Sequence, residues 1–394
     1  MLFFLLFNTV WLGLHVYLGW RLLKPLTRKK YWWRTTLGLL VITYLSVPIT
    51  LFGRLVIYDP SLFDVLAWVA YLGMGFILVL FPLRLTLDIV LLTGWLYKKL
   101  QQGLQRNPGH ADTPNTERRA LIANTLNLGL VGLSGAMTTA GLYEARQIPQ
   151  VKNISIPVTG LAAGLQDFRI IQLSDLHLGP TIKGAYLQAI VERCNSLDAD
   201  MVVITGDLVD GFTYELSNDV TPLQQLRSRY GTFFVTGNHE YYWGAEDWVE
   251  YLKVLGIHVL INEHHFIRHN ETRLLLAGAT DHHAYRHVPE HASDPQKARA
   301  HAGSADMSIL LAHQPKSAFA GAAAGYDLQL SGHVHGGQFF PWNFMIKLVQ
   351  PFNNGLHRVE DRMWLYVSAG SGYWGPPQRL GVPPEITRIK LVRA

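Results

Sequence analysis

Five short polar clusters in the chain consist of residue types that bind metal ions. In chain order they are Asp175-Leu-His177, Gly206-Asp207-Leu-Val-Asp210, Gly237-Asn238-His239-Glu240, Ala312-His313-Gln314 and Gly332-His333-Val334-His335-Gly336-Gly337. The last cluster places two imidazoles one residue apart between glycines, which let the backbone bend tightly around an ion. A lone Asp-x-His is usually a capped turn, but five such clusters in one chain favour a shared metal site.

Carboxylate, amide and neutral imidazole ligands without a thiolate suit divalent ions such as Mn²⁺, Fe²⁺ or Zn²⁺. The candidate ligands are Asp175, His177, Asp207, Asn238, His313, His333 and His335. These side chains are too many for one tetrahedral shell. Two ions about 3.5–4 Å apart, bridged by one carboxylate and a hydroxide, would use them all and would hold the attacking and leaving oxygens of a phosphoryl transfer.

The clusters follow apolar segments that are predicted to be β-strands. Strand-like runs cover residues 168–174, 201–205 and 232–236, with helical stretches at 185–195 and 222–228 between them. Further strand candidates lie at 273–277, 308–312, 327–330, 364–368 and 386–392. This pattern indicates a large mixed α/β sheet system. In open α/β sheets ligands bind beyond the carboxyl ends of the strands, so the polar residues are expected to converge there.

The order of the five clusters resembles that of the calcineurin-like metallophosphoesterases. The resemblance covers about residues 165 to 394, including a tail, 366–370 and 375–386, that is similar to the tail of membrane-anchored bacterial members. It implies a two-sheet αββα sandwich of the α/β class for a domain over residues 148–394. It also implies hydrolysis of a phosphomonoester or phosphodiester through attack by a metal-bridging hydroxide.

The family pattern, carried over by position, implies two metal sites that share one carboxylate. The first site would be formed by Asp175, His177, Asp207 and His335. The second site would be formed by Asp207, Asn238, His313 and His333. Asp207 would bridge the two ions, because an ionised carboxylate offers an oxygen to each.

Three further residues are candidates for catalysis or support. His239 would stabilise developing charge on the phosphate or protonate the leaving oxygen, unless it only orients Asn238. Asp210 would orient an imidazole. Arg379 would contact a substrate anion through its fork of donors, or form a salt bridge with Glu385.

Two segments near the clusters leave alternatives open. Residues 281–301 contain five histidines; a third metal site and a solvated loop at the rim both fit, and the irregular spacing favours the loop. Residues 338–349 are unusually apolar, which fits either core packing or an exposed patch that enters a membrane interface and brings a lipid headgroup to the metals. The inserted side chains would be Phe339, Phe340, Trp342 and Phe344.

The first 147 residues are predicted to form an all-α membrane region. The chain is 49% hydrophobic and 16% charged, and most of the apolar excess lies in this part. A span needs about 20 apolar residues, and the four candidate segments are 2–20, 36–57, 62–97 and 120–143. A cleaved signal peptide is disfavoured, because the basic cluster follows the first apolar run and no cleavage site is present.

Residues 62–97 determine the predicted side of the catalytic domain. They contain Pro82, Arg84 and Asp88, and they fit either one long helix with an i,i+4 ion pair or two spans joined near the proline. Basic residues follow both the first and the third segment, so the positive-inside rule favours one crossing. We therefore expect an integral protein of the inner membrane with an extracytoplasmic catalytic domain, whereas two crossings would place that domain in the cytoplasm.

The expected partners are a phosphate-ester substrate, with a phospholipid or lipid-linked phosphate as one candidate, and the bilayer. The formal net charge of +5 does not indicate nucleic-acid binding, because much of the basic excess flanks the membrane segments. A nucleotide or nucleic-acid phosphodiesterase is one alternative, and a metal-dependent sensor or binding protein without turnover is another. Cys194 is the single cysteine, so no internal disulfide can form.

Overall fold

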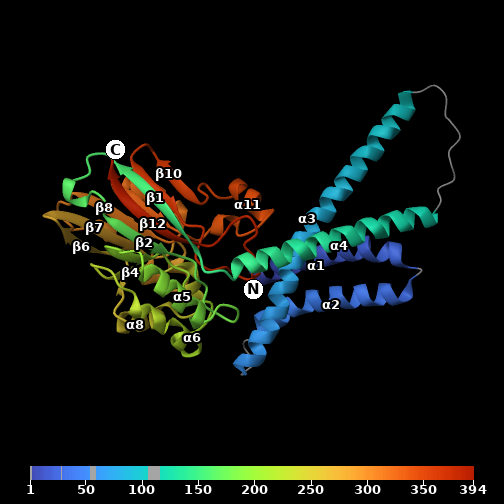
Figure 1. Cartoon of the computed structure of the whole chain (residues 1–394), viewed down its shortest axis with the longest axis horizontal. Coiled ribbons are helices and arrows are strands. Elements are labelled where there is room, and N and C mark those ends of the chain that lie inside the picture. Colours follow the sequence, from blue (N-terminus) through green and yellow to red (C-terminus); the bar gives the residue numbers. More distant parts are fainter. Residues whose placement is uncertain (1, 28, 54–58, 105–115) are drawn as a thin grey trace. The chain divides into compact units, whose positions relative to one another are not determined.

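The structure is a computed structural model, and it describes residues 2–27, 29–53, 59–104 and 116–394 (Figure 1). The chain divides into two compact units, Met1–Ala140 and Gly141–Ala394. The assignment of residues 1–147 to a membrane region stays a prediction.

The first unit is helical. Its helices are α1 (Leu2–Leu23), α2 (Lys30–Gly53), α3 (Pro60–Leu104) and α4 (Thr116–Ala145). Within the described residues, three helices are long and apolar enough to cross a membrane: α2, α3 as far as Gly103, and α4. α1 lies over the first predicted span, and its crossing stays a prediction. The end of the second predicted span, residues 54–57, lies outside the described residues.

The segment 62–97 lies within one continuous helix, α3. This helix has 45 residues, which corresponds to a length of about 68 Å at 1.5 Å per residue. Pro82 lies inside it, so the chain makes no turn where the alternative of two spans would need one. Arg84 Nη2 and Asp88 Oδ1 are 2.5 Å apart, which is the ion pair expected for a single long helix.

Asp88 is the centre of a partly buried polar cluster that joins three helices. Its Oδ2 also accepts hydrogen bonds from the Tyr17 hydroxyl at 2.5 Å and from Arg21 Nε at 2.6 Å. Arg84 in turn donates to Asn127 Oδ1 at 3.1 Å. Charged groups in apolar surroundings need such partners. The cluster therefore connects α1, α3 and α4 by polar contacts in addition to apolar packing.

The second unit contains two six-stranded mixed sheets. The first sheet consists, in spatial order, of β1 (Gln150–Val158), β12 (Glu385–Arg393), β2 (Arg169–Leu173), β3 (Met201–Ile204), β4 (Thr232–Phe234) and β5 (His258–Val259). The second sheet consists of β10 (Gly355–Val359), β11 (Met363–Val367), β9 (Leu328–Ser331), β8 (Met307–Ala312), β7 (Thr272–Ala279) and β6 (Glu263–His269). The neighbours from β2 to β5 are parallel, as are those from β11 to β7.

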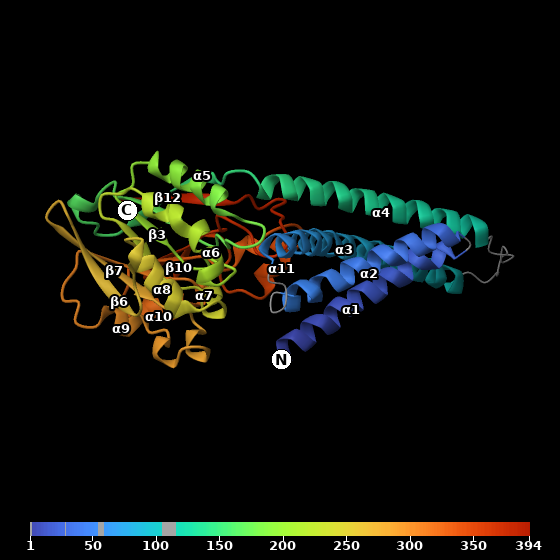
Figure 2. The same ribbon diagram turned by 90° about the horizontal axis from the view of Figure 1, so that it is seen from below.

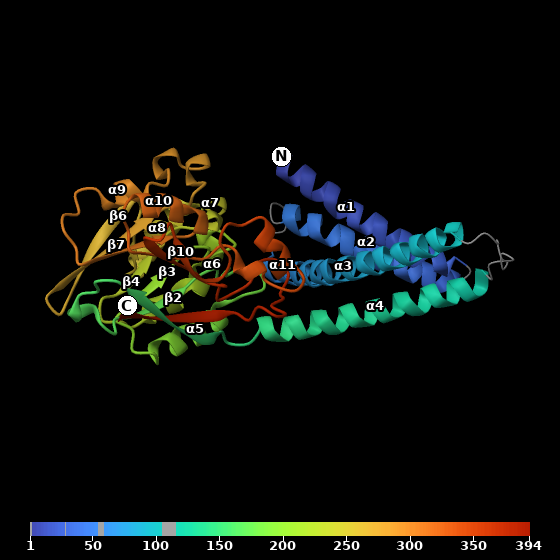
Figure 3. The ribbon, with the colours of Figure 1, turned by 90° about the horizontal axis from the view of Figure 1, so that it is seen from above.

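Helices cover the outer faces of both sheets. Apolar side chains of both sheets, such as Ile170 and Ile309, share one core between them. The first sheet is covered by α5 (Gly184–Asn195), α6 (Thr213–Val220) and α8 (Ala245–Val254), and the second by α9 (Pro295–Arg299) and α10 (Ala318–Ala323). Figure 2 and Figure 3 show α5 and α9 on opposite sides of the sheets. The predicted two-sheet αββα sandwich is confirmed.

The last turn of α4 belongs to the second unit. Ala145 is fully buried in the core on the outer face of the first sheet. The Gly141 carbonyl accepts a hydrogen bond from the Arg379 backbone N–H at 3.0 Å. A Cβ added at Gly141 would lie 3.3 Å from the Cβ of Leu380. The helix therefore ends inside the fold of this unit.

Candidate metal centre

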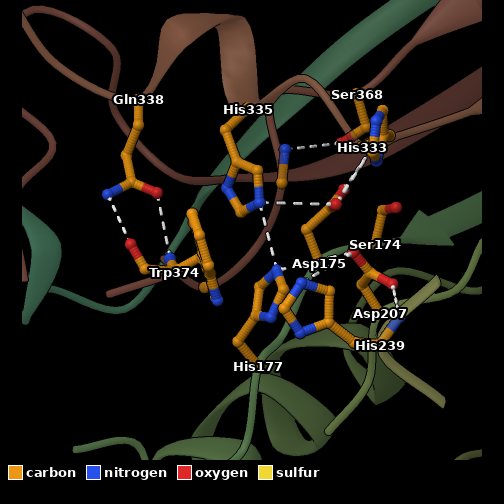
Figure 4. Close-up of polar contacts among 12 residues, drawn as sticks. Ser174, Asp175, His177, Asp207, His239, His333, His335, Gln338, Ser368 and Trp374 are labelled. Carbon is orange, nitrogen blue, oxygen red and sulfur yellow. Dashed lines mark hydrogen bonds and ion pairs between the residues drawn. The ribbon is translucent and has the colours of Figure 1, made fainter. Parts of the chain in front are cut away.

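The seven predicted metal ligands follow five strands of the second unit, either in loops or at the first residue of a short helix. The loops after β2, β3 and β4 carry the ligands from the first half of the domain, and the loops after β8 and β9 carry His313, His333 and His335. Figure 4 shows side chains from both sheets pointing toward one another. The sandwich thus brings the carboxyl ends of strands from both sheets together, as the sequence predicted for the polar clusters.

One group of ligand atoms surrounds the His177 imidazole. Its Nε2 lies 3.1 Å from Nε2 of His335 and 3.8 Å from Oδ2 of Asp207. Nε2 of His335 is in turn 3.5 Å from Oδ1 of Asp175. All four side chains are buried. A group of imidazole and carboxylate atoms this compact, with Asp175, His177 and His335 mutually within ligand distance, suits one divalent ion.

A second group surrounds the His313 imidazole. Its Nε2 lies 3.1 Å from Oδ2 of Asp207 and 3.2 Å from Nδ1 of His333. Asn238 Oδ1 is buried and accepts no hydrogen bond from any residue that the structure describes. A buried amide oxygen without a partner costs free energy, and a cation would satisfy it. The donor set and this unpartnered oxygen both fit a second divalent ion.

Asp207 lies between the two groups, since its Oδ2 faces His177 on one side and His313 on the other. Burial acts to raise the pKa of this carboxyl, but the nearby imidazoles of His313 and His239 outweigh burial and hold the pKa well below its ordinary value. The side chain is therefore an ionised carboxylate, which is the form that can bind two cations.

The backbone at five of the seven ligands is left-handed. The φ angles are 53° at Asp175, 49° at His177, 52° at Asp207, 73° at His333 and 49° at His335. Residues other than glycine rarely adopt this region, and its cost is accepted mainly at functional sites. The loops therefore hold these side chains in a geometry that serves the site at the expense of local stability.

Gly237 and Glu240 fix the position of the loop that carries Asp207. The buried Glu240 carboxylate accepts hydrogen bonds from the backbone N–H groups of Gly237 at 2.6 Å, Asp207 at 3.0 Å and Leu208 at 2.7 Å. Sequence reasoning gave Glu240 no role, although a Glu three residues after the N-cap Gly237 occupies the acidic position of a capping box. Gly237 has no side chain, and a Cβ there would contact the Asp207 carboxylate.

His239 and Asp210 form a hydrogen-bonded pair beside the metal ligands. His239 Nδ1 is 2.5 Å from Asp210 Oδ1, which also lies 3.3 Å from His177 Nδ1. Burial lowers the pKa of His239, but the carboxylates of Asp207 and Asp210 outweigh it and raise that pKa to about 9. The rings of Tyr242 and Trp374 flank the imidazole, with centroids 5.2 and 5.6 Å away. Neither aromatic residue was predicted to belong to the site.

Arg379 lies behind His335, on the buried side of the site. Its guanidinium is fully buried and donates to the carbonyls of Ala369, at 2.7 Å, and Gly372, and its Nη2 is 3.1 Å from His335 Nδ1. No salt bridge between Arg379 and Glu385 is present among the described residues; Glu385 pairs with Lys152 at 3.0 Å instead. These contacts support a structural role next to His335 rather than contact with a substrate anion.

The two segments with open alternatives have different structures. In the His-rich segment, His291 Nδ1 and the Tyr241 hydroxyl are hydrogen-bonded at 2.9 Å, and the His287 ring packs near Tyr242. The segment therefore lies against the short helix α7 (Asn238–Tyr242), which carries His239.

In the apolar segment, Phe339 is buried while Phe344 is 58% exposed. The start of the apolar segment is therefore packed in the core, whereas its end is exposed.

Comparison with known proteins gives one family. The model of the family described as "Calcineurin-like phosphoesterase" matches residues 168–337. An uncharacterized metallophosphoesterase of Campylobacter jejuni is 33% identical over 381 residues, covering 96% of this chain and 94% of the relative. A "Transmembrane protein with metallophosphoesterase domain" of Danio rerio is 39% identical over 269 residues, covering 66% of this chain and 62% of the relative.

The chain spans about 62% of the length of the Danio rerio relative and of a similarly named relative from Bos taurus. Among solved structures, a 5′-nucleotidase precursor from Thermus thermophilus is 15% identical with a TM-score of 0.37, covering 52% of this chain and 49% of that chain. A similarity this low has no bearing on the substrate.

Proposed function

Because the chain belongs to the calcineurin-like phosphoesterase family, we propose that it is a membrane-attached, metal-dependent phosphoester hydrolase. The position of Asp207 carries this proposal, since one buried carboxylate oxygen faces a ligand group on each side at 3.1 and 3.8 Å. Two divalent ions, when bound, would supply the positive charge that polarises a phosphate ester and activates the attacking water.

We assign the proposed ligand roles to the side chains of the two groups. Asp175, His177 and His335 would hold one ion and His313, His333 and Asn238 the other, with Asp207 shared. This assignment uses the buried, unpartnered Asn238 Oδ1 and leaves none of the seven side chains without a role.

His239 would act on the substrate directly. The hydrogen bond between its Nδ1 and Asp210 places the second ring nitrogen, Nε2, toward the centre, 3.9 Å from Asp207 Oδ2. An imidazole held in this way can keep a proton on Nε2 and deliver it to the leaving oxygen. Asp210 is then a positioning residue, because it acts through His239 and His177.

The substrate class that we favour is a phosphomonoester or phosphodiester presented at a membrane. Three described helices long and apolar enough to cross a membrane, together with relatives named as transmembrane proteins, support membrane attachment. A lipid or lipid-linked phosphate would be available to a domain tethered there. The single crossing of α3 and an extracytoplasmic domain at the inner membrane are part of the same proposal.

The test uses the purified full chain loaded with Mn²⁺ and an aryl phosphodiester or phosphomonoester as substrate. Asp207→Asn should abolish turnover while the far-UV circular dichroism stays unchanged. The matched control is Asp361→Asn, because Asp361 is exposed and its φ of 53° is close to the 52° of Asp207. Two bound metals without turnover on any phosphate ester would favour a metal-binding sensor, and preference for nucleotides over lipid phosphates would favour a nucleotide phosphodiesterase.

The orientation has its own test. A reporter fused after Ala394 that is active only outside the cytoplasm should give signal in intact cells. Activity of a reporter that works only in the cytoplasm would exclude the extracytoplasmic arrangement, without any consequence for the hydrolytic site.

A further inference from the structure

The segment from Phe344 to Val349 presents an exposed run of apolar side chains. It comprises the end of α11 (Trp342–Met345) and the 3-10 turn that follows, Ile346–Leu348. Leu348 is 76% and Val349 75% exposed, and Phe344 and Met345 are more than half exposed. Other exposed large apolar residues described in the second unit stand singly in the sequence. Exposed apolar side chains this close together in the sequence are typical of an interaction surface.

A cavity of about 330 Å³ lies next to this segment. Its polar lining consists of Gln150, Lys152, Asn343, Lys347, Asn353, Asn354 and Glu385. A volume at the lower end of the range for ligand sites fits a small headgroup rather than a large molecule. None of the seven proposed metal ligands lines it, so the cavity is separate from the metal centre.

The charges in the cavity favour an anion. Glu385 is already paired with Lys152 and accepts a hydrogen bond from the Tyr366 hydroxyl at 2.7 Å. Lys347 forms no ion pair with any carboxylate in the described part of the chain, and it projects from the same segment as the exposed apolar residues. The cavity therefore has one cationic group in excess, at its apolar side.

The amide oxygens of two asparagines in the lining are not available to a ligand. The Oδ1 atoms of Asn343 and Asn353 are buried, and neither accepts a hydrogen bond from the described residues. A group the size of a hydroxyl cannot reach a buried oxygen. The Lys347 ammonium is therefore the group that would attract an anion into the cavity.

Chain connectivity places this cavity near the end of a membrane-spanning candidate. One wall is formed by Gln150, Val151 and Lys152 at the start of β1. Ala145, the last residue of α4, precedes Gln150 by five residues, which span at most about 18 Å when extended. If α4 crosses the bilayer as proposed above, the cavity is held close to the membrane surface.

We propose that this cavity binds the headgroup of an anionic phospholipid through Lys347 while the exposed apolar side chains of residues 344–349 insert into the same leaflet. The bound headgroup would lie against Gly336, which lines the cavity and directly follows the proposed ligand His335. The backbone is close to its neighbours there, since a Cβ added at Gly336 would be 3.2 Å from Asn354 Cγ. The lipid site rests on the membrane attachment proposed above, but not on catalysis.

The test measures lipid contact of the segment in the full chain. Cys194 is the single cysteine and is buried, so a Cys194→Ala background with Phe344→Cys accepts one environment-sensitive fluorophore. The protein is placed in nanodiscs of phosphatidylcholine alone or with phosphatidylglycerol, each containing spin-labelled lipid as quencher. We expect quenching at position 344 that grows with phosphatidylglycerol. The matched control, Val254→Cys, labels an equally apolar residue that is 81% exposed on α8, and it should show none.

Charge reversal at Lys347 separates headgroup binding from simple apolar insertion. A basic group near an anionic surface contributes enough that Lys347→Glu should lower the docking equilibrium constant on the order of tenfold. Lys297→Glu, at an exposed lysine on α9, should have no effect. A label at Leu348→Cys repeats the measurement if the Phe344 variant folds poorly.

Three results would overturn the proposal. Absence of quenching at 344 and 348 in phosphatidylglycerol nanodiscs would exclude membrane insertion. Equal quenching in both lipid mixtures, unchanged by Lys347→Glu, would exclude the headgroup site. Iodide in the buffer quenches a fluorophore that is exposed to water. If the label at position 344 became protected from iodide only as the protein concentration rose, the exposed apolar side chains would be assigned to contact with a second copy of the chain. Loss of the protein from carbonate-washed membranes would identify failure of membrane attachment instead.

Discussion

Gly237→Ala tests whether the space at one glycine controls the metal centre. The residue has φ −95° and ψ −172°, which alanine adopts without strain, so the expected effect is steric. The new Cβ would lie 2.6 Å from the Asp207 backbone nitrogen and 2.9 Å from Asp207 Cγ. Ordinary contacts between such atoms need about 3.5–4.0 Å, so the Asp207 carboxylate must move by roughly 1 Å.

A displacement of that size at the shared ligand should lower kcat about 100-fold, which corresponds to roughly 2.7 kcal/mol of activation free energy. The assay is hydrolysis of an aryl phosphodiester by the Mn²⁺-loaded full chain, with metal content measured by atomic emission. Overpacking should also cost about 1–3 kcal/mol of folding stability.

Gly256→Ala is the control for a general loss of stability. Gly256 has φ 82°, and a Cβ there would meet no atom within 4 Å. Its variant should lose about 1–2 kcal/mol through backbone strain and keep wild-type metal content and kcat. A Gly237→Ala enzyme with two bound metals and wild-type kcat would refute the steric reasoning.

Further predictions concern the ligands and the His239 pair. Asn238→Ala should weaken binding of one of two metals at least about tenfold, measured by calorimetric titration. Asp210→Asn should lower the pKa of His239, because a carboxylate 2.5 Å from Nδ1 is lost; if protonated His239 is the acid, the alkaline fall in kcat then begins at lower pH than in wild type. Chelation should lower the Tm of the second unit, since an ion present at 100 times its Kd contributes about 2.7 kcal/mol.

The interior strands were predictable from the sequence and the edge strands were not. All eight predicted strands are present, and the four missed ones, β1, β5, β6 and β10, are the edges of the two sheets. Interior parallel strands are covered on both faces and read as continuous apolar runs. An edge strand such as β6, Glu-His-His-Phe-Ile-Arg-His, alternates exposed and buried positions and contains four charged or imidazole residues before its last histidine, so its pattern resembles a polar loop.

The candidate ligands were predictable because chemistry limits their residue types. Convergence followed from the rule that polar residues after strands meet at one edge. The supporting residues were harder to find: the Glu240 carboxylate acts through three backbone N–H groups, and Trp374 reaches His239 from a loop more than 130 residues away. Local sequence patterns contain no information on such contacts, because they depend on how the loops pack in three dimensions.

The final turn of α4 affects where the second unit can be cut from the helices that precede it. A version that begins at residue 148 would lack Ala145 in its core and the Gly141 carbonyl that accepts a hydrogen bond from Arg379, the residue that contacts His335. Such a truncation should be less stable than one that begins at Gly141. The exchange of this helix for another would therefore also have to preserve Gly141 and Ala145, which make these contacts in the second unit.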